Sequence, residues 1–304
     1  MTTADTPATI PAHLWRAASL GERKAVELDI GRLDYFERGE GPVVVFAHGW
    51  LANANLWRKV VERLADRFRC IALDLPLGSH RVAVRADADL SPTSCGELIA
   101  QALAALNLDA VTLVGNDSGG AYSQIATAAH PERVARLVLN SCETPYDAFP
   151  PPPFDGLPAL ARDSIVLGQV LEALRDRENR STPAAYGRLV KHAIDDLVSD
   201  SYVLPCLTDP DVLRDTSKVM ASAVSEPVHN AGRRLISTFD RPVLFAWGPE
   251  DQVFPLAHAQ RYAQELADGQ VAMIPDAFSF TPEDQPQRLA AALAQFCAGQ
   301  VLPT

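Results

Sequence analysis

The sequence contains no pair of cysteines spaced for a zinc site or for a small disulfide framework. Its five cysteines are scattered and odd in number, with no Cys-x-x-Cys pair, so we expect buried thiols in a reducing compartment. The chain also lacks a run of the roughly 20 apolar residues that a membrane-spanning helix requires. Residues 1–11 carry neither a basic region nor an apolar segment, so we expect no secretory signal there. These absences predict a cytoplasmic protein that has no membrane partner.

Positive charge is scarce as well. The chain has 27 Lys and Arg residues against 38 Asp and Glu residues, which gives a net charge of −11. An acidic chain repels nucleic acid and anionic membrane surfaces, so we expect neither as a partner. A glycine-rich turn is present, but it lacks the Lys-Ser/Thr pair of a phosphate-binding loop. The sequence therefore predicts no metal and no cofactor, and it carries no signal for an oligomeric state.

The order of elements predicts an α/β fold with an insertion. The chain has 304 residues, of which 47% are hydrophobic, enough for one large domain. Short apolar runs alternate with helical patterns up to residue 145 and again from residue 235, which favours a mostly parallel, doubly wound sheet. Between them lie residues 146–234, which contain four consecutive prolines near their start, at 150–153, followed by a helical pattern. We expect 1–145 and 235–304 to form the core and 146–234 to form a helical cap.

The segment 111–122 carries the main catalytic signal. An apolar run at 111–114 predicts a buried strand, a glycine-rich turn centred near Asp117 follows, and residues 121–130 read as a helix. Strand, tight turn and helix are typical of a nucleophile elbow. The flanking Gly115 and Gly119 favour Asp117 as the residue at the tip, while Ser118 is the alternative. Asp117 in a plain helix-capping role is a further alternative.

The identity of the tip residue determines the chemistry. A carboxylate attacks a saturated carbon and forms an ester, which opens an epoxide or displaces a halide. A serine would instead carry out acyl transfer.

Other polar residues follow the ends of predicted strands. The amide groups after His48-Gly49, including that of Trp50, are placed to hold negative charge. In open parallel sheets, ligands bind beyond the carboxyl ends of the strands. On this ground we expect His80, Glu143 and Asp251 near the reacting groups. The candidates to line a substrate pocket below the cap are His48, Tyr146 and Tyr186.

The motifs His48-Gly49-Trp50, Gly115 to Gly120, His130 to Val134 and Gly248 to Asp251 resemble those of the α/β-hydrolase superfamily over essentially the whole chain. Asp at the elbow is similar to the epoxide hydrolase and haloalkane dehalogenase branch. The resemblance implies that Asp117 is the nucleophile and that the amides of Trp50 and Ser118 form the anion hole. It also implies that Asp251, or alternatively Glu143, orients a histidine.

The chain departs from this pattern at the histidine itself. The family places it about 28 residues beyond the acid, where this sequence has Ser279, and no histidine occurs after His258. Ser118 and Trp50 also replace the tryptophan and asparagine of the dehalogenases, which argues against haloalkane turnover.

Three interpretations follow from the missing histidine. The first, which we favour, is an Asp117-dependent hydrolase of a small, apolar organic substrate, with His80 as the leading substitute base. The second is a non-hydrolytic cyclase, isomerase or lyase that uses Asp117 as general acid or base. The third is a protein that binds a small molecule without catalysis.

Overall fold

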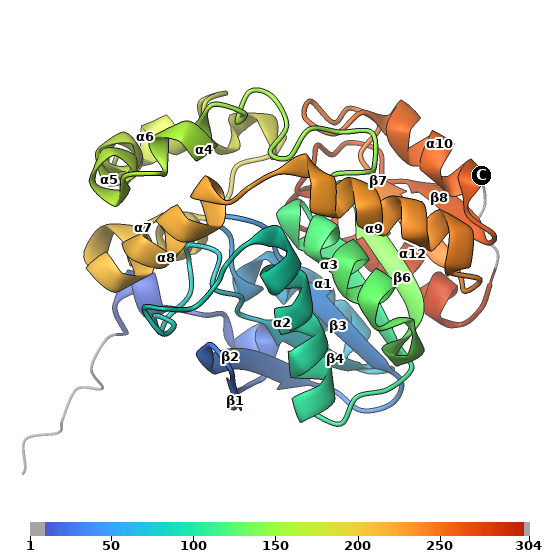
Figure 1. Ribbon diagram of the computed structural model, residues 1–304. Helices are drawn as coiled ribbons and strands as arrows, with labels where there is room; N and C mark the ends of the chain where they lie inside the picture. Colours follow the sequence, from blue (N-terminus) through green and yellow to red (C-terminus); the bar gives the residue numbers. More distant parts are fainter. Residues whose placement is uncertain (1–9, 301–304) are drawn as a thin grey trace, which may run out of the picture.

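In the computed structural model, which describes residues 10–300, eight strands form one sheet in the order β1-β2-β4-β3-β5-β6-β7-β8 (Figure 1). The strands β1 and β2 form an antiparallel hairpin, β2 also pairs antiparallel with β4, and the remaining neighbours are parallel. The expectation of no secretory signal falls mainly on residues 1–9, which lie outside the described residues. The strands are β1 (Glu22–Leu28), β2 (Gly31–Arg38), β3 (Val43–Ala47), β4 (Arg69–Leu73), β5 (Val111–Asn116), β6 (Val134–Asn140), β7 (Val243–Trp247) and β8 (Gly269–Met273).

Helices cover both faces of the sheet. On one face α2, α3 and α9 lie side by side, and on the other α1 packs against α12 (Figure 1). The helices are α1 (Arg58–Leu64), α2 (Pro92–Ala105), α3 (Ser118–Ala129), α4 (Leu157–Leu160), α5 (Ser164–Glu172), α6 (Arg177–Arg180), α7 (Asp196–Thr208), α8 (Pro210–Ala221), α9 (Ser225–Thr238), α10 (Leu256–Glu265), α11 (Thr281–Asp284) and α12 (Pro286–Cys297). Short 3₁₀ turns include η1 (Ala12–Leu14) and η3 (Ala54–Trp57).

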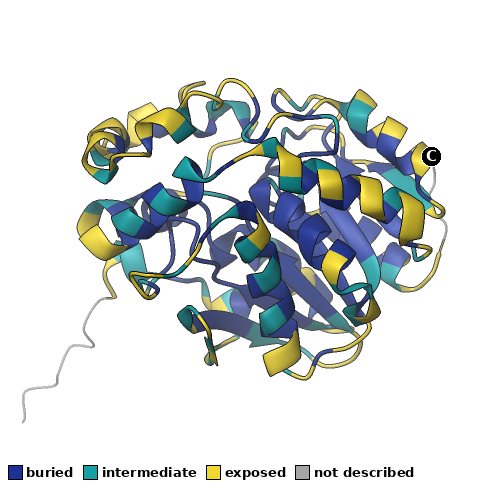
Figure 2. Ribbon diagram, in the orientation of Figure 1, coloured by how far each residue is buried: buried dark blue, intermediate teal, exposed yellow. Residues whose placement is uncertain are grey.

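The sequence pattern explains this layering. The central strands β3 and β5 are continuous apolar runs, and they are buried along almost their whole length because helices cover both faces (Figure 2). The helix α2 begins where Ser91 caps it, with the Ser91 hydroxyl accepting a hydrogen bond from the Ser94 amide and Pro92 in the first turn. The predicted α/β fold class is confirmed.

The insertion between β6 and β7 contains α4 to α9 and no strand. The helices α4 to α8 lie beyond the carboxyl ends of the central strands (Figure 1), whereas α9 packs against α3 within the helix layer of the core. Within residues 10–300, no helix is long and apolar enough to cross a membrane.

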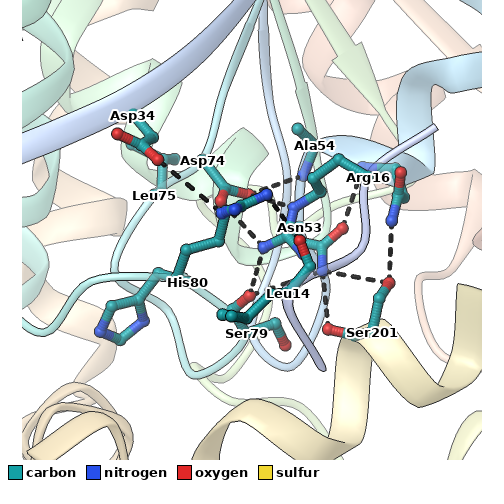
Figure 3. A network of polar contacts seen from close by, with 12 residues as sticks. Leu14, Arg16, Asp34, Asn53, Ala54, Asp74, Leu75, Ser79, His80 and Ser201 are labelled. Carbon is teal, nitrogen blue, oxygen red and sulfur yellow. Dashed lines mark hydrogen bonds and ion pairs between the residues drawn. The ribbon is translucent and has the colours of Figure 1, made fainter. Parts of the chain in front are cut away.

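A buried ion pair joins the N-terminal segment to the strand ends. Arg16 donates to Asp74 at 2.8 Å and to the Ser79 carbonyl oxygen at 2.7 Å (Figure 3). The other oxygen of Asp74 accepts from the Ala54 amide, at the start of η3. Neither side chain of the pair is more than 1% exposed. The pair therefore fixes the loops that follow β3 and β4 relative to one another.

Loss of Arg16 should destabilise the fold strongly. Arg16→Ala leaves the buried Asp74 carboxylate without its counter-ion, so we expect a loss of about 3–5 kcal/mol in the free energy of unfolding, measured by urea denaturation at pH 7. The control is Arg85→Ala, which breaks the exposed pair with Asp87 and should cause no measurable change. Equal effects of the two variants would contradict the assigned role of the buried pair.

Candidate active site

Asp117 lies at the turn between β5 and α3, in a backbone conformation that non-glycine residues rarely adopt, with φ 55° and ψ −143°. The turn is possible because small residues surround it. A Cβ added at Gly49 would lie 2.3 Å from Oδ1 of Asp117, and one added at Gly119 would lie 2.4 Å from the His48 carbonyl oxygen. The glycines thus permit the close approach of two loops and the strain at Asp117. A strand, a tight turn with positive φ and a helix follow one another here, as in the arrangement expected from the sequence.

The backbone amide of Ser118 holds the Asp117 carboxylate, and the amide of Trp50 lies close by. The Ser118 amide donates to Oδ1 of Asp117 at 2.5 Å. The Trp50 amide donates to the Ser118 hydroxyl at 2.9 Å, and it also favours the ionised form of Asp117. With Oδ1 held in this way, Oδ2 is the oxygen left to react. The amide-bound Oδ1 is the atom that would carry negative charge if an ester on Asp117 were attacked by water.

Asp117 opens onto a cavity of about 330 Å³ below the insertion helices. Its wall is largely apolar, and much of it comes from the proline-rich segment after β6 and from α5 and α8. The lining residues include Trp50, Leu51, Asp117, Ser118, Tyr122, Glu143, Phe149, Pro150, Phe154, Leu171, Tyr186, Val219, Met220 and Phe254. A cavity of this size and character fits a small, apolar organic molecule.

Three carboxyl groups, those of Asp117, Glu143 and Asp251, lie at this edge of the sheet. Burial, opposed by the amides of Ser118 and Trp50, raises the pKa of Asp117 to about 6. Burial and the charge of Asp117 raise the pKa of Glu143 well above its usual range. Glu143 lines the cavity, is 2% exposed, and its Oε2 has no hydrogen-bond partner among the described residues. Such groups are typical of functional sites.

Asp251 and Ser279 form a pair behind the cavity. The Ser279 hydroxyl donates to Oδ1 of Asp251 at 2.7 Å. The same oxygen accepts from the amides of Val253 and Phe254, and burial raises the pKa of this carboxyl group. Ser279 therefore occupies the hydrogen-bonding position that a histidine partner of Asp251 would take. Within residues 10–300, no histidine lines the cavity.

The structure does not bring His80 to the cavity. His80 is buried with Asp215, its Nε2 lying 3.2 Å from the carboxylate, while its Nδ1 faces the Gly78 amide at 3.4 Å. Both ring nitrogens are engaged away from Asp117, so its position does not support a role as substitute base. His229 lies beside the Asp147 carbonyl oxygen and does not line the cavity either.

His48 and Tyr146 also lie outside the cavity, which corrects their assignment to the substrate pocket. His48 is fully buried, accepts a hydrogen bond from the Leu75 amide and contacts the Gly49 carbonyl oxygen. Burial lowers its pKa to about 4, so the ring is neutral and structural. The Tyr146 hydroxyl donates to the exposed Glu265. Tyr186, by contrast, lines the cavity and donates to the Leu51 carbonyl oxygen at 2.6 Å.

The sequence interpretation missed Tyr122 and the linker residues Phe149 and Pro150, all of which line the cavity. Tyr122 follows Ser118 by four positions on α3, so helical periodicity places both on one face. That spacing could have identified it. The linker carried no such signal, because its path over the sheet depends on the packing of the insertion.

The mostly parallel sheet with helices on both faces, and the aspartate at the turn after β5, are the features that a comparison with known proteins addresses. A family model described as the alpha/beta hydrolase fold matches residues 42–286, and the chain belongs to this family. Haloalkane dehalogenase 2 of Mycobacterium tuberculosis (strain ATCC 25618 / H37Rv) is 25% identical over 277 residues, which cover 87% of this chain and 91% of the relative.

Two further proteins are similar to this chain. A pimeloyl-[acyl-carrier protein] methyl ester esterase of Vibrio vulnificus (strain YJ016) is 26% identical over 77% of this chain and 86% of its own length. A crystal structure of an alpha/beta hydrolase fold protein from Burkholderia ambifaria is similar with a TM-score of 0.74 and 24% identity, covering 89% of this chain and 96% of the other. Relatives with different activities share this fold, so the reaction has to be argued from the site.

The buried carboxylate of Asp117 should lower stability at neutral pH. In the unfolded chain this group ionises near its ordinary pKa of 3.8, and in the folded chain near 6. Between these values the folded chain retains a proton that the unfolded chain has released, so stability falls as the pH rises through this window. We expect Asp117→Asn to stabilise the protein at pH 7 by at most about 3 kcal/mol, and to have little effect near pH 4. Thermal unfolding at both pH values measures this, and a pH-independent difference would contradict it.

Proposed function

We propose that this protein is a hydrolase that acts on a small, apolar organic substrate through nucleophilic attack by Asp117, with an epoxide as the favoured substrate class. The observation that carries the proposal is the elbow itself. Asp117 faces the apolar cavity, and its Oδ1 accepts from the Ser118 amide. An ester on Asp117 would place the developing oxyanion on an atom that is already held.

An epoxide suits the site better than a haloalkane does. Haloalkane dehalogenase 2 is among the relatives at 25% identity, but Ser118 follows the nucleophile here where the family resemblance leads one to expect tryptophan. The Ser118 hydroxyl accepts from the Trp50 amide, so this amide is already engaged. A leaving halide would therefore find little to bind it. Epoxide opening releases no anion, provided that a proton reaches the ring oxygen.

Mass spectrometry of the intact protein tests the proposal directly. We expect incubation with a panel of epoxides in oxygen-18 water to yield diols, with the label entering first into the Asp117 carboxylate, because water attacks the acyl carbon of the ester. Asp117→Asn and Asp117→Ala should form neither adduct nor product. Because attack requires the carboxylate, the rate of ester formation should fall about tenfold per pH unit below about 6.

Two results would contradict this function. One is the absence of any adduct and any product in the unmodified protein across the panel, which would favour ligand binding without catalysis. The other is turnover that persists in Asp117→Ala. Cleavage of p-nitrophenyl esters that is lost in Ser118→Ala but retained in Asp117→Asn would favour a serine esterase.

A second candidate function is non-hydrolytic rearrangement, with Asp117 as general acid or base. The observation that favours it is Ser279, which fills the position of the expected histidine and donates to Asp251. A serine hydroxyl cannot accept a proton from water at neutral pH without a base beside it. In this case the substrate would be converted to an isomer, and oxygen-18 would enter neither Asp117 nor the product.

Replacement of Ser279 by histidine should accelerate hydrolysis. We expect Ser279→His to place an imidazole beside Asp251 and to raise the hydrolysis rate of an Asp117 ester about tenfold or more, since general bases contribute on the order of 10²–10⁴. Ser279→Ala is the matched control and should show no gain. Single-turnover decay of the ester mass measures both. A folded Ser279→His variant no faster than Ser279→Ala would contradict position 279 as a place from which a base reaches the ester.

A further inference from the structure

We propose that Glu143 is the proton donor and acceptor of the Asp117 reaction. As a neutral acid it protonates the epoxide oxygen during ring opening, and as a carboxylate it then activates water against the Asp117 ester. This inference rests on the proposed function and assigns to Glu143 the part that the missing histidine leaves vacant.

Topology brings Glu143 to the reacting carboxylate. The strands β5 and β6 are parallel neighbours, with Asn116 paired to Asn140 at their ends. Just beyond, the Asp117 amide donates to the Ser141 carbonyl oxygen at 3.0 Å. Glu143 follows two residues later and lines the same cavity as Asp117. Its backbone is fixed because the Gln124 side-chain amide donates to the Glu143 carbonyl oxygen at 2.7 Å.

The Glu143 side chain is poised for a partner that the protein does not supply. It is 2% exposed, and within residues 10–300 its Oε2 has no hydrogen-bond partner. A buried polar atom without a partner costs free energy and calls for an explanation. Glu143 and Asp117 both line the cavity, so rotation of the Glu143 carboxyl group would bring Oε2, which is itself covered, to a substrate oxygen or a water molecule there.

The protonation state suits both steps. Burial and the negative charge of Asp117 raise the pKa of Glu143 well above its usual range, so Glu143 is an uncharged acid while Asp117 is ionised. Formation of the ester removes the charge of Asp117, a charge that raises the pKa of Glu143 together with burial, the largest cause, and the charge of Asp147. Glu143 therefore ionises more readily at the stage where a base is needed.

The two steps balance. In the first, Oδ2 of Asp117 bonds to a ring carbon, the ring C–O bond breaks, and the Glu143 proton passes to the ring oxygen. In the second, Glu143 takes one proton from water as its oxygen bonds to the Asp117 acyl carbon, and the acyl–oxygen bond of the ester then breaks. The departing diol oxygen takes the second water proton, which leaves Asp117 ionised and Glu143 neutral. No further reagent is required.

The other acid at this edge is less suited to the role. Oδ1 of Asp251 accepts hydrogen bonds from two amides and from Ser279, and Asp251 does not line the cavity. Its contacts make it a group that fixes the loop after β7. Glu143 is the carboxyl group besides Asp117 that lines the cavity.

A pair of alkylating substrates separates the two roles of Glu143. An epoxide needs a proton on its leaving oxygen, whereas an activated (benzylic or allylic) bromide of related carbon skeleton releases bromide without a proton and without a halide site. In Glu143→Gln we expect ester formation from the epoxide to slow about 100-fold or more, and ester formation from the bromide to remain within about threefold of the unmodified protein. The bromide-derived ester should then persist on Asp117, because the base is gone. Rapid quenching and intact-mass spectrometry measure each rate.

Control variants keep the test decisive. Glu97→Gln, on the outer side of α2, should match the unmodified protein in every rate, and Glu143→Asp, which retains a carboxyl group, should recover part of the epoxide rate. Circular dichroism and thermal unfolding establish that each variant is folded.

The outcomes distinguish this inference from the proposed function. If the unmodified protein forms the Asp117 ester, but Glu143→Gln opens the epoxide and hydrolyses the ester at unchanged rates, the role of Glu143 is overturned and the proposed function stands. If Glu143→Gln slows both reagents equally, Glu143 acts on structure and the inference also fails. If the unmodified protein forms no ester with either reagent, both proposals fall.

Discussion

The close approach of two loops at the end of β5 is the constraint on which the site depends. A side chain at Gly49 would collide with the Asp117 carboxylate, and one at Gly119 would collide with the backbone at His48. These contacts hold Asp117 at positive φ and bring the amides of Ser118 and Trp50 to its carboxylate. Burial of the surrounding strands stabilises the arrangement, since the strain of such a residue persists only where its surroundings determine it.

The acidic elbow has an electrostatic consequence. Burial disfavours the charged forms of Asp117, Glu143 and Asp251 and raises their pKa values; the charge of Asp251 adds to this at Asp117, and the charge of Asp117 adds to it at Glu143. The three carboxyl groups are therefore not all ionised at neutral pH. Burial therefore favours a neutral Glu143 beside Asp117, which is the state that the proposed proton-assisted attack requires.

Most of the fold could be predicted from the sequence because apolar runs and turn residues record it locally. The strand predicted at 111–114 lies within β5, and Asp117 could be placed by its flanking glycines. His80 could not be placed correctly, because its partner Asp215 lies 135 residues away on an insertion helix. The same holds for Tyr146, whose orientation depends on its contact with Glu265. A strand end predicts an edge of the sheet, but it does not predict the direction of a side chain.

The missing histidine changes which carboxyl group can act. With an imidazole in place, an acid beside it serves to orient the ring, and either Asp251 or Glu143 could have filled that role. With Ser279 in that position, Oδ1 of Asp251 accepts from a hydroxyl and two amides, while its Oδ2 is buried without a partner among the described residues and Asp251 does not line the cavity. Glu143 has no such contacts at Oε2 within the described chain and lines the cavity. Glu143 therefore differs from Asp251 in lining the cavity, and this difference is the ground on which we propose Glu143, and not Asp251, as the acid that acts on the substrate.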